Sequence, residues 1–281
     1  MIKSPQILMI RPRKLREEFD QALSQIKDAG IEVYCYNQSK DTHSEMAFCC
    51  RSWISTKSDG GIIIYPLKEE SRRDERQEEL ISFLEGEGFE LDHVTDYSGA
   101  EDYEEYLEGE CSMVLDRDNE IAFASIGGHS TEELFIEFCE DQYFFPVLLD
   151  TQEDFINSIL SIGKHFAIVC LELIQDKKQR KSLLNQLKST GREPIVISQQ
   201  QVKAYCGEVV FLPSKNDEIL LMSSTAYNQY TSTQLEQLNQ KVNIQILEIT
   251  QLEKLSSKSI GSMISEIRLK NTKNRLLSIV P

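Results

Sequence analysis

The chain has 281 residues, of which 40% are hydrophobic and 27% charged, and its formal net charge at pH 7 is −16. This composition is typical of a globular protein with a sizeable core and excludes a disordered chain. The acidic charge argues against nucleic acid and anionic membrane surfaces as partners, because phosphate groups are bound by clustered Lys and Arg. No apolar run approaches a bilayer span of roughly 18 residues, and Met1 to Pro5 lacks a signal-peptide apolar segment. We therefore expect a cytoplasmic protein.

The cysteines argue against a disulfide framework and against a zinc site. They are odd in number and lack C-x-x-C or Cys/His spacing, and several lie in apolar runs such as Ile168 to Leu171. No G-x-G-x-x-G or G-x-x-x-x-G-K-S/T segment is present to hold a nucleotide. We predict no metal and no cofactor, and reduced, buried thiols at Cys35, Cys49, Cys50, Cys111, Cys139, Cys170 and Cys206.

Hydrophobic periodicity predicts strands and helices that alternate along the whole chain. In the first half the predicted strands are Gln6–Ile10, Ile31–Tyr36, Ala47–Ser55, Gly61–Tyr65, Phe89–Thr95, Ser112–Asp116 and Ile121–Ser125, and the predicted helices are Lys14–Ala29, Glu69–Leu84 and Thr131–Glu140. In the second half the predicted strands are Phe166–Leu173, Glu193–Ile197, Val209–Leu212, Ile219–Ser223, Ile244–Ile249 and the closing Met263–Ile267, and the predicted helices are Lys177–Ser189 and Thr231–Asn239. No linker rich in Gly, Ser or Pro interrupts them, so we predict one α/β domain over residues 1–281, built from recurring small units.

Three segments together carry a family resemblance. They are Tyr65-Pro66-Leu67 followed by S-R-R-D-E-R from Ser71, then L-E-G-E-C-S-M-V-L-D from Leu107, and finally Ser259–Ile267 with the upstream Glu253. In this order and spacing they resemble the guanidine-modifying superfamily of arginine deiminases, amidinotransferases and dimethylarginine dimethylaminohydrolases, and most of all its citrulline-utilisation hydrolases. The resemblance covers nearly the whole chain. It implies a single-domain five-bladed α/β propeller with pseudo-fivefold symmetry, the pentein fold.

The resemblance also implies a covalent chemistry. In the superfamily a cysteine thiolate attacks a guanidinium or ureido carbon, a histidine shuttles protons, and carboxylates hold the cationic nitrogens. Here the nucleophile position holds Ser262 and the histidine position holds Phe155, with Asn157 retained two residues later. Glu108 stands at the position of a substrate-holding acid, and Glu45 aligns near a second acid.

Other polar residues admit two interpretations. Arg72 and Arg73 would form a clamp for a substrate carboxylate by resemblance, whereas their spacing fits an exposed helix face with salt bridges. The acidic segment Asp96–Glu110 fits a solvated loop or a lid that attracts a cation. We interpret His43, His93, His129 and His165 as surface or hydrogen-bonded residues, with His165 the candidate for a relocated base, and Cys111 as a packed thiol or a substitute nucleophile.

Serine and phenylalanine at the nucleophile and histidine positions favour a loss of catalytic activity. A serine without a base is a poor nucleophile, and phenylalanine cannot accept a proton. The leading hypothesis is a catalytically degenerate member that binds an arginine-like or citrulline-like small molecule or a protein partner. The first alternative is an active hydrolase or deiminase with a rearranged nucleophile. The second is an interaction scaffold or homo-oligomer without a small-molecule ligand.

Overall fold

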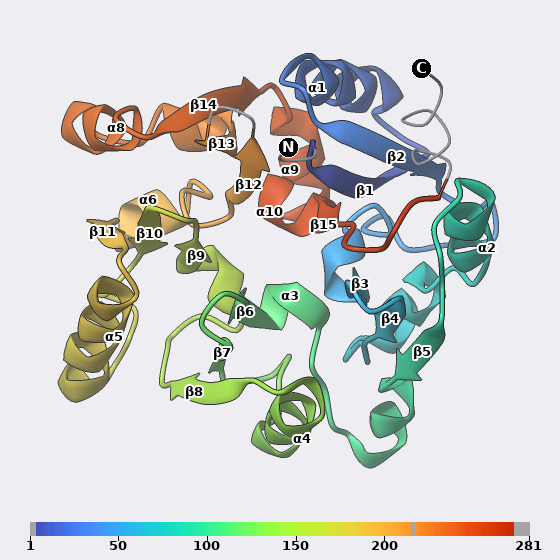
Figure 1. Cartoon of the computed structure of the whole chain (residues 1–281), viewed down its shortest axis with the longest axis horizontal. Coiled ribbons are helices and arrows are strands. Elements are labelled where there is room, and N and C mark those ends of the chain that lie inside the picture. Colours follow the sequence, from blue (N-terminus) through green and yellow to red (C-terminus); the bar gives the residue numbers. More distant parts are fainter. Residues whose placement is uncertain (1–3, 215–216, 273–281) are drawn as a thin grey trace.

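The computed structural model describes residues 4–214 and 217–272. These residues form five three-stranded sheets arranged around a central axis (Figure 1). In each sheet the middle strand pairs antiparallel with an inner strand and parallel with an outer one. This architecture confirms the predicted five-bladed α/β propeller.

Each blade places its helix between the middle and the outer strand, because parallel strands need a crossover connection. The first blade is β15 (Ser265–Glu266), β1 (Gln6–Arg11), α1 (Arg16–Asp28) and β2 (Glu32–Asn37). The second is β3 (Ile54–Thr56), β4 (Gly61–Ile64), α2 (Glu79–Gly86) and β5 (His93–Asp96), and the third is β6 (Met113–Asp116), β7 (Ile121–Ser125), α4 (Glu132–Gln142) and β8 (Phe145–Leu149). The fourth is β9 (Leu160–Ile162), β10 (Phe166–Val169), α5 (Lys177–Ser189) and β11 (Glu193–Val196). The fifth is β12 (Val210–Ser214), β13 (Asp217–Ser223), α7 (Ser224–Tyr227), α8 (Ser232–Leu238) and β14 (Val242–Leu247).

The two ends of the described chain meet in the first blade. Strand β15 pairs antiparallel with β1, with Ile7 opposite Glu266 and Leu8 opposite Ser265. The late strand thus completes a sheet begun by the earliest one and closes the ring.

The middle strands form the core of each blade. They are buried on both faces, as in Ile7 to Ile10 of β1 and Ile62 to Ile64 of β4, and therefore read as continuous apolar runs. This is why sequence periodicity predicted all five of them. None of the helices in residues 4–214 and 217–272 is long and apolar enough to span a bilayer.

Several predicted elements differ from the structure. The predicted helix Glu69–Leu84 is two elements, the 3-10 helix η2 (Glu70–Glu75) and α2, because Arg76 between them has an extended backbone. The predicted strand Ala47–Ser55 is mostly a turn with the 3-10 helix η1 (Cys50–Ser52), followed by the short β3. The sequence missed β8, an outer strand that is mostly half-exposed, and β9, which has only three residues.

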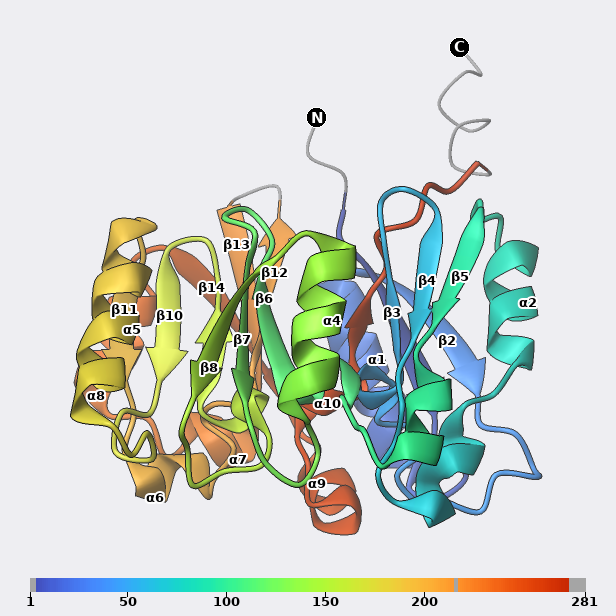
Figure 2. The ribbon, with the colours of Figure 1, turned by 90° about the horizontal axis from the view of Figure 1, so that it is seen from below.

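Short helical turns precede four of the inner strands. They are η1 before β3, α3 (Gly109–Ser112) before β6, η4 (Ile156–Ser158) before β9, and α10 (Ile260–Met263) before β15. These turns contact one another near the axis. They lie at the end of the molecule opposite the β-hairpin turns (Figure 2). The fold thus brings four distant stretches of sequence together at one end of the axis.

Candidate functional site

The predicted site residues Glu108, Asn157 and Ser262 lie on these turns. Glu108 is the residue before α3, Asn157 is part of η4, and Ser262 is part of α10. The exposed fractions of Glu108 and Ser262 are 0% and that of Asn157 is 4%. All three are therefore removed from solvent in this conformation.

Ser262 lies in a buried polar network. Its Oγ donates to Oε2 of Glu208 at 3.1 Å and accepts from Nδ2 of Asn157 at 3.3 Å. Burial raises the pKa of the neighbouring Cys111 to about 11, against the opposing effects of Lys258 and of a hydrogen bond with Ser262. Cys111 therefore stays a thiol at neutral pH, which does not favour a nucleophile.

Two further carboxylate contacts fix the loop that carries Ser262. The backbone N–H of Ser259 donates to Glu208 at 2.8 Å, and the Ser259 hydroxyl donates to Glu253 at 2.6 Å. Glu253 also accepts from the hydroxyl of Thr225 at 2.6 Å. Because such buried bonds are costly to leave unmade, this loop is held in one position.

Glu108 is held by two cationic or imidazole side chains. Its Oε2 accepts from Nη1 of Arg72 at 2.6 Å, and its Oε1 lies 2.7 Å from Nδ1 of His129. Burial would raise the pKa of Glu108, but the hydrogen bond with His129 and the charge of Arg72 outweigh it and lower the pKa. Glu108 is therefore a carboxylate with both oxygens occupied.

Arg72 is a buried guanidinium between two buried acids. Besides Glu108, it donates to Glu75 at 2.9 and 3.1 Å and to the Ser52 hydroxyl at 3.1 Å. Glu75 is also fully buried. The chain thus places its own guanidinium on the carboxylate that the sequence assigned to a ligand.

Phe155, at the position predicted for the family histidine, contacts an imidazole and an ammonium group. Its ring centroid is 4.5 Å from that of His129, and Nζ of Lys258 lies 3.4 Å from the ring centroid on a cation–π contact. The described contacts give this ring no role in proton transfer. They do place an imidazole and an ammonium beside it.

His129 is the functional candidate that the sequence did not single out. It follows Gly127 and Gly128 in the loop after β7, and its side chain is 16% exposed. The glycine pair is the only local signal, and it predicts a turn rather than a site. His165, the sequence candidate for a relocated base, instead pairs with Asp217 at 2.6 Å beside the β12–β13 hairpin.

Glu45 and Arg73 do not contact this cluster. Glu45 is exposed and forms an ion pair with Lys14, and Arg73 pairs with Glu101 at 3.0 Å. Glu101, from the acidic segment, also holds Arg76. Arg73 therefore behaves as the salt-bridge interpretation of the arginine-rich segment predicts, whereas Arg72 does not.

The predicted burial of the thiols is confirmed for every cysteine except Cys35. Six of the seven cysteines are buried and Cys35 is partly exposed, all without disulfides. Within residues 4–214 and 217–272, no three His, Cys, Asp or Glu side chains are grouped to hold a metal ion.

Comparison with known proteins now places the chain. Its five-bladed fold is that of the pentein class of guanidine-modifying proteins. The sequence model of eukaryotic N,N-dimethylarginine dimethylhydrolases matches residues 8–269, and the chain belongs to that family. The predicted superfamily is confirmed. No curated protein sequence matches the chain.

Solved structures share the fold at low identity. The apo arginine dihydrolase ArgZ from the ornithine–ammonia cycle in cyanobacteria superposes with a TM-score of 0.74 at 12% identity, over 94% of this chain and 39% of ArgZ. The N-terminal domain of a substrate-bound ArgZ mutant gives 0.73 at 13% identity, over 94% and 98% of the two chains. A dimethylarginine dimethylaminohydrolase adduct gives 0.68 at 9% identity, over 94% and 99%. The present chain thus spans about two-fifths of full-length ArgZ.

Proposed function

We propose that this chain is a catalytically inactive member of its family that binds a small ureido or guanidino compound without turning it over. The observation that carries the proposal is the burial of Ser262, which has an exposed fraction of 0% and contacts an amide and a carboxylate rather than an imidazole. This hydroxyl therefore lacks the imidazole base that activates a serine nucleophile most often.

The ligand preference follows from the charges that are already paired. Arg72 occupies Glu75 and Glu108, so a ligand guanidinium would have to displace an internal one. Lys258 and the Phe155 ring lie beside the same cluster and suit a carboxylate-bearing, uncharged ureido compound. We therefore expect the chain to bind citrulline-like compounds more tightly than arginine-like ones. The narrower membership in the citrulline-utilisation branch is part of this proposal.

Ligand binding is tested by thermal unfolding with citrulline, arginine, agmatine, methylarginines and ornithine. A compound at about 100 times its Kd stabilises the fold by roughly 2.7 kcal/mol. We expect the largest shift with citrulline, and its loss in Lys258→Met, which keeps the length of the side chain. The matched control Lys14→Met removes a lysine from the exposed ion pair with Glu45 and should keep the shift. No shift with any compound would reject the ligand and favour an interaction scaffold.

The second candidate function is hydrolysis by Ser262. Glu208 lies 3.1 Å from Oγ and could accept the hydroxyl proton. Turnover is tested by incubating the chain with arginine, citrulline and methylarginines and measuring the release of ammonia, ornithine and dimethylamine. We expect none above a blank. Turnover that disappears in both Ser262→Ala and Glu208→Gln would overturn the inactive assignment.

A further inference from the structure

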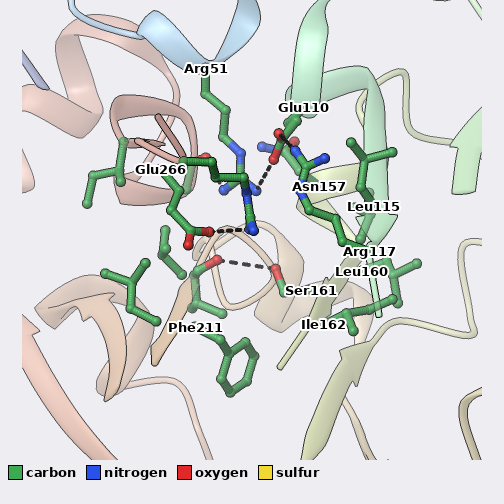
Figure 3. Close-up of a pocket in the computed structure, with 17 residues that line it drawn as sticks. Arg51, Glu110, Leu115, Arg117, Asn157, Leu160, Ser161, Ile162, Phe211 and Glu266 are labelled. Atoms are coloured by element: carbon green, nitrogen blue, oxygen red, sulfur yellow. Dashed lines mark hydrogen bonds and ion pairs between the residues drawn. The ribbon is translucent and has the colours of Figure 1, made fainter. Parts of the chain in front are cut away.

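A cavity of about 110 Å³ lies on the propeller axis between the inner strands. Arg51, Arg117, Glu110 and Glu266 line it together with Leu160, Ile162 and Phe211 (Figure 3). Arg268 also lines it. The charged groups therefore lie against an apolar wall, where electrostatic interactions are stronger than in water.

The charges of this cavity do not balance. Three guanidinium groups face two carboxylates, so the lining has a net charge of +1 in a chain whose net charge is −16. Burial would raise the pKa of Glu110, but Arg117, Arg51 and Arg268 lower it to about 2. Glu110 is thus charged at neutral pH and is shared by Arg51 and Arg117, while Arg268 pairs with Glu266, so three guanidinium groups have two carboxylates between them.

The arginines keep hydrogen-bond donors for an occupant. Arg51 donates from Nη1 to the Gly261 carbonyl at 3.1 Å and from Nη2 to Glu110 at 3.0 Å. In the described part of the chain, the side chains of Arg117 and Arg268 each make one hydrogen bond, through Nη2, to Glu110 and Glu266 respectively. Each guanidinium carries five donors in a fork that matches oxyanion geometry.

One acceptor in the lining also lacks a partner. Asn157 is 4% exposed and lines the cavity, and its Oδ1 has no hydrogen-bond partner among the described residues. A buried acceptor of this kind needs a donor, from water or from an occupant. An occupant that carries a proton on one oxygen and charge on the others would satisfy both Asn157 and the arginines.

We propose that the axial cavity formed by Arg51, Arg117 and Arg268 binds a small protonated oxyanion, such as hydrogen phosphate or bicarbonate. The cavity adjoins the proposed ureido site through Asn157, which lines the cavity and donates to Ser262, but its lining does not include Phe155 or Lys258.

Thermal unfolding of the full chain in different anions tests the proposal. Sodium phosphate, bicarbonate, sulfate and chloride are compared at one pH and one ionic strength, because salt alone screens the repulsion within an acidic protein. We expect a saturable rise in Tm with phosphate or bicarbonate, a smaller rise with sulfate, and none with chloride. The larger of the first two shifts identifies the preferred anion. Equal Tm values in all four salts would overturn the site, and a sulfate effect as large as that of phosphate would overturn the role given to Asn157.

Calorimetric titration of phosphate into variants locates the site. Arg268→Gln makes the lining neutral and should weaken phosphate about tenfold or more. Arg11→Gln is the matched control, since Arg11 also pairs with one acid and its side chain is 29% exposed against 34% for Arg268. Unchanged affinity in Arg268→Gln would reject the assignment. Arg117→Gln provides the same test if the first variant does not fold.

Discussion

The ion pairs of Arg72 offer the most direct test of how the site is filled. Arg72→Ala would leave Glu75 and Glu108, both with an exposed fraction of 0%, without their shared cation. Removing one partner of a buried ion pair costs about 3–5 kcal/mol, because the other charge stays buried and unpaired. We expect a loss of this size in the free energy of unfolding, measured with urea at pH 7.5.

Arg73→Ala is the control for this variant. Arg73 is the next residue, its side chain is 32% exposed, and its partner Glu101 retains Arg76. Loss of a partly exposed ion pair costs about 0–1 kcal/mol. If Arg72→Ala lowers the free energy of unfolding no more than Arg73→Ala does, the argument that the buried acids depend on Arg72 is refuted.

Free guanidinium extends the same test. In Arg72→Ala the two carboxylates form an empty guanidinium site, so millimolar guanidinium chloride should raise Tm, by an amount equivalent to roughly 2.7 kcal/mol at 100 times its Kd. The Tm of the wild-type protein should rise no more in guanidinium chloride than in the same concentration of sodium chloride. Without Arg72 the pKa values of the two acids rise. The difference in free energy of unfolding between wild type and Arg72→Ala should therefore shrink as the pH falls from 8 to 5. Equal rescue by sodium would show that the pocket does not recognise a guanidinium.

Three further predictions concern the scaffold. Gly207→Ala should lower the free energy of unfolding in urea by about 2–3 kcal/mol or more, because its Cβ would lie 1.7 Å from the Ser158 carbonyl oxygen. The control Gly86→Ala, with nothing within 4 Å of its Cβ, should be neutral or stabilising by about 0.5–1 kcal/mol. Equal effects of the two substitutions would contradict the close approach at Gly207. Since the pKa of Glu110 is lowered to about 2, its stabilisation, on the order of 3 kcal/mol, is complete above about pH 4.3 and is lost toward pH 2; the stability gap to Glu110→Gln should therefore narrow from pH 6 to pH 3, and a constant gap would contradict it. Ellman's reagent should label at most Cys35 in the native protein, because the other thiols are buried; a second reactive thiol would contradict the described packing.

The sequence was sufficient for the architecture because the blades are encoded locally. Each middle strand is a short apolar run, each crossover helix has its own periodicity, and the units follow one another without a linker. The ordered motifs then selected the pentein arrangement among α/β folds. The elements that were missed, β8 and β9, are short or lie at the edge of a blade, where burial and therefore periodicity are weak.

The contacts of the site could not be predicted in the same way. Arg72 and Arg73 are adjacent in an alternating charged segment, and local sequence does not say which one is buried. One partner of Glu108 is His129, which lies 21 residues away in a loop of the same blade. Sequence spacing cannot give that contact, because it depends on how the loop folds back onto the axis.

Residue identity alone suggested the proposal of an inactive protein, since Ser262 and Phe155 cannot supply a thiolate and an imidazole. Only the tertiary structure decided what surrounds them. Four turns from different blades meet at the axis, and desolvation there forces each buried charge to find a partner within the protein. That requirement places the guanidinium of Arg72 between Glu75 and Glu108.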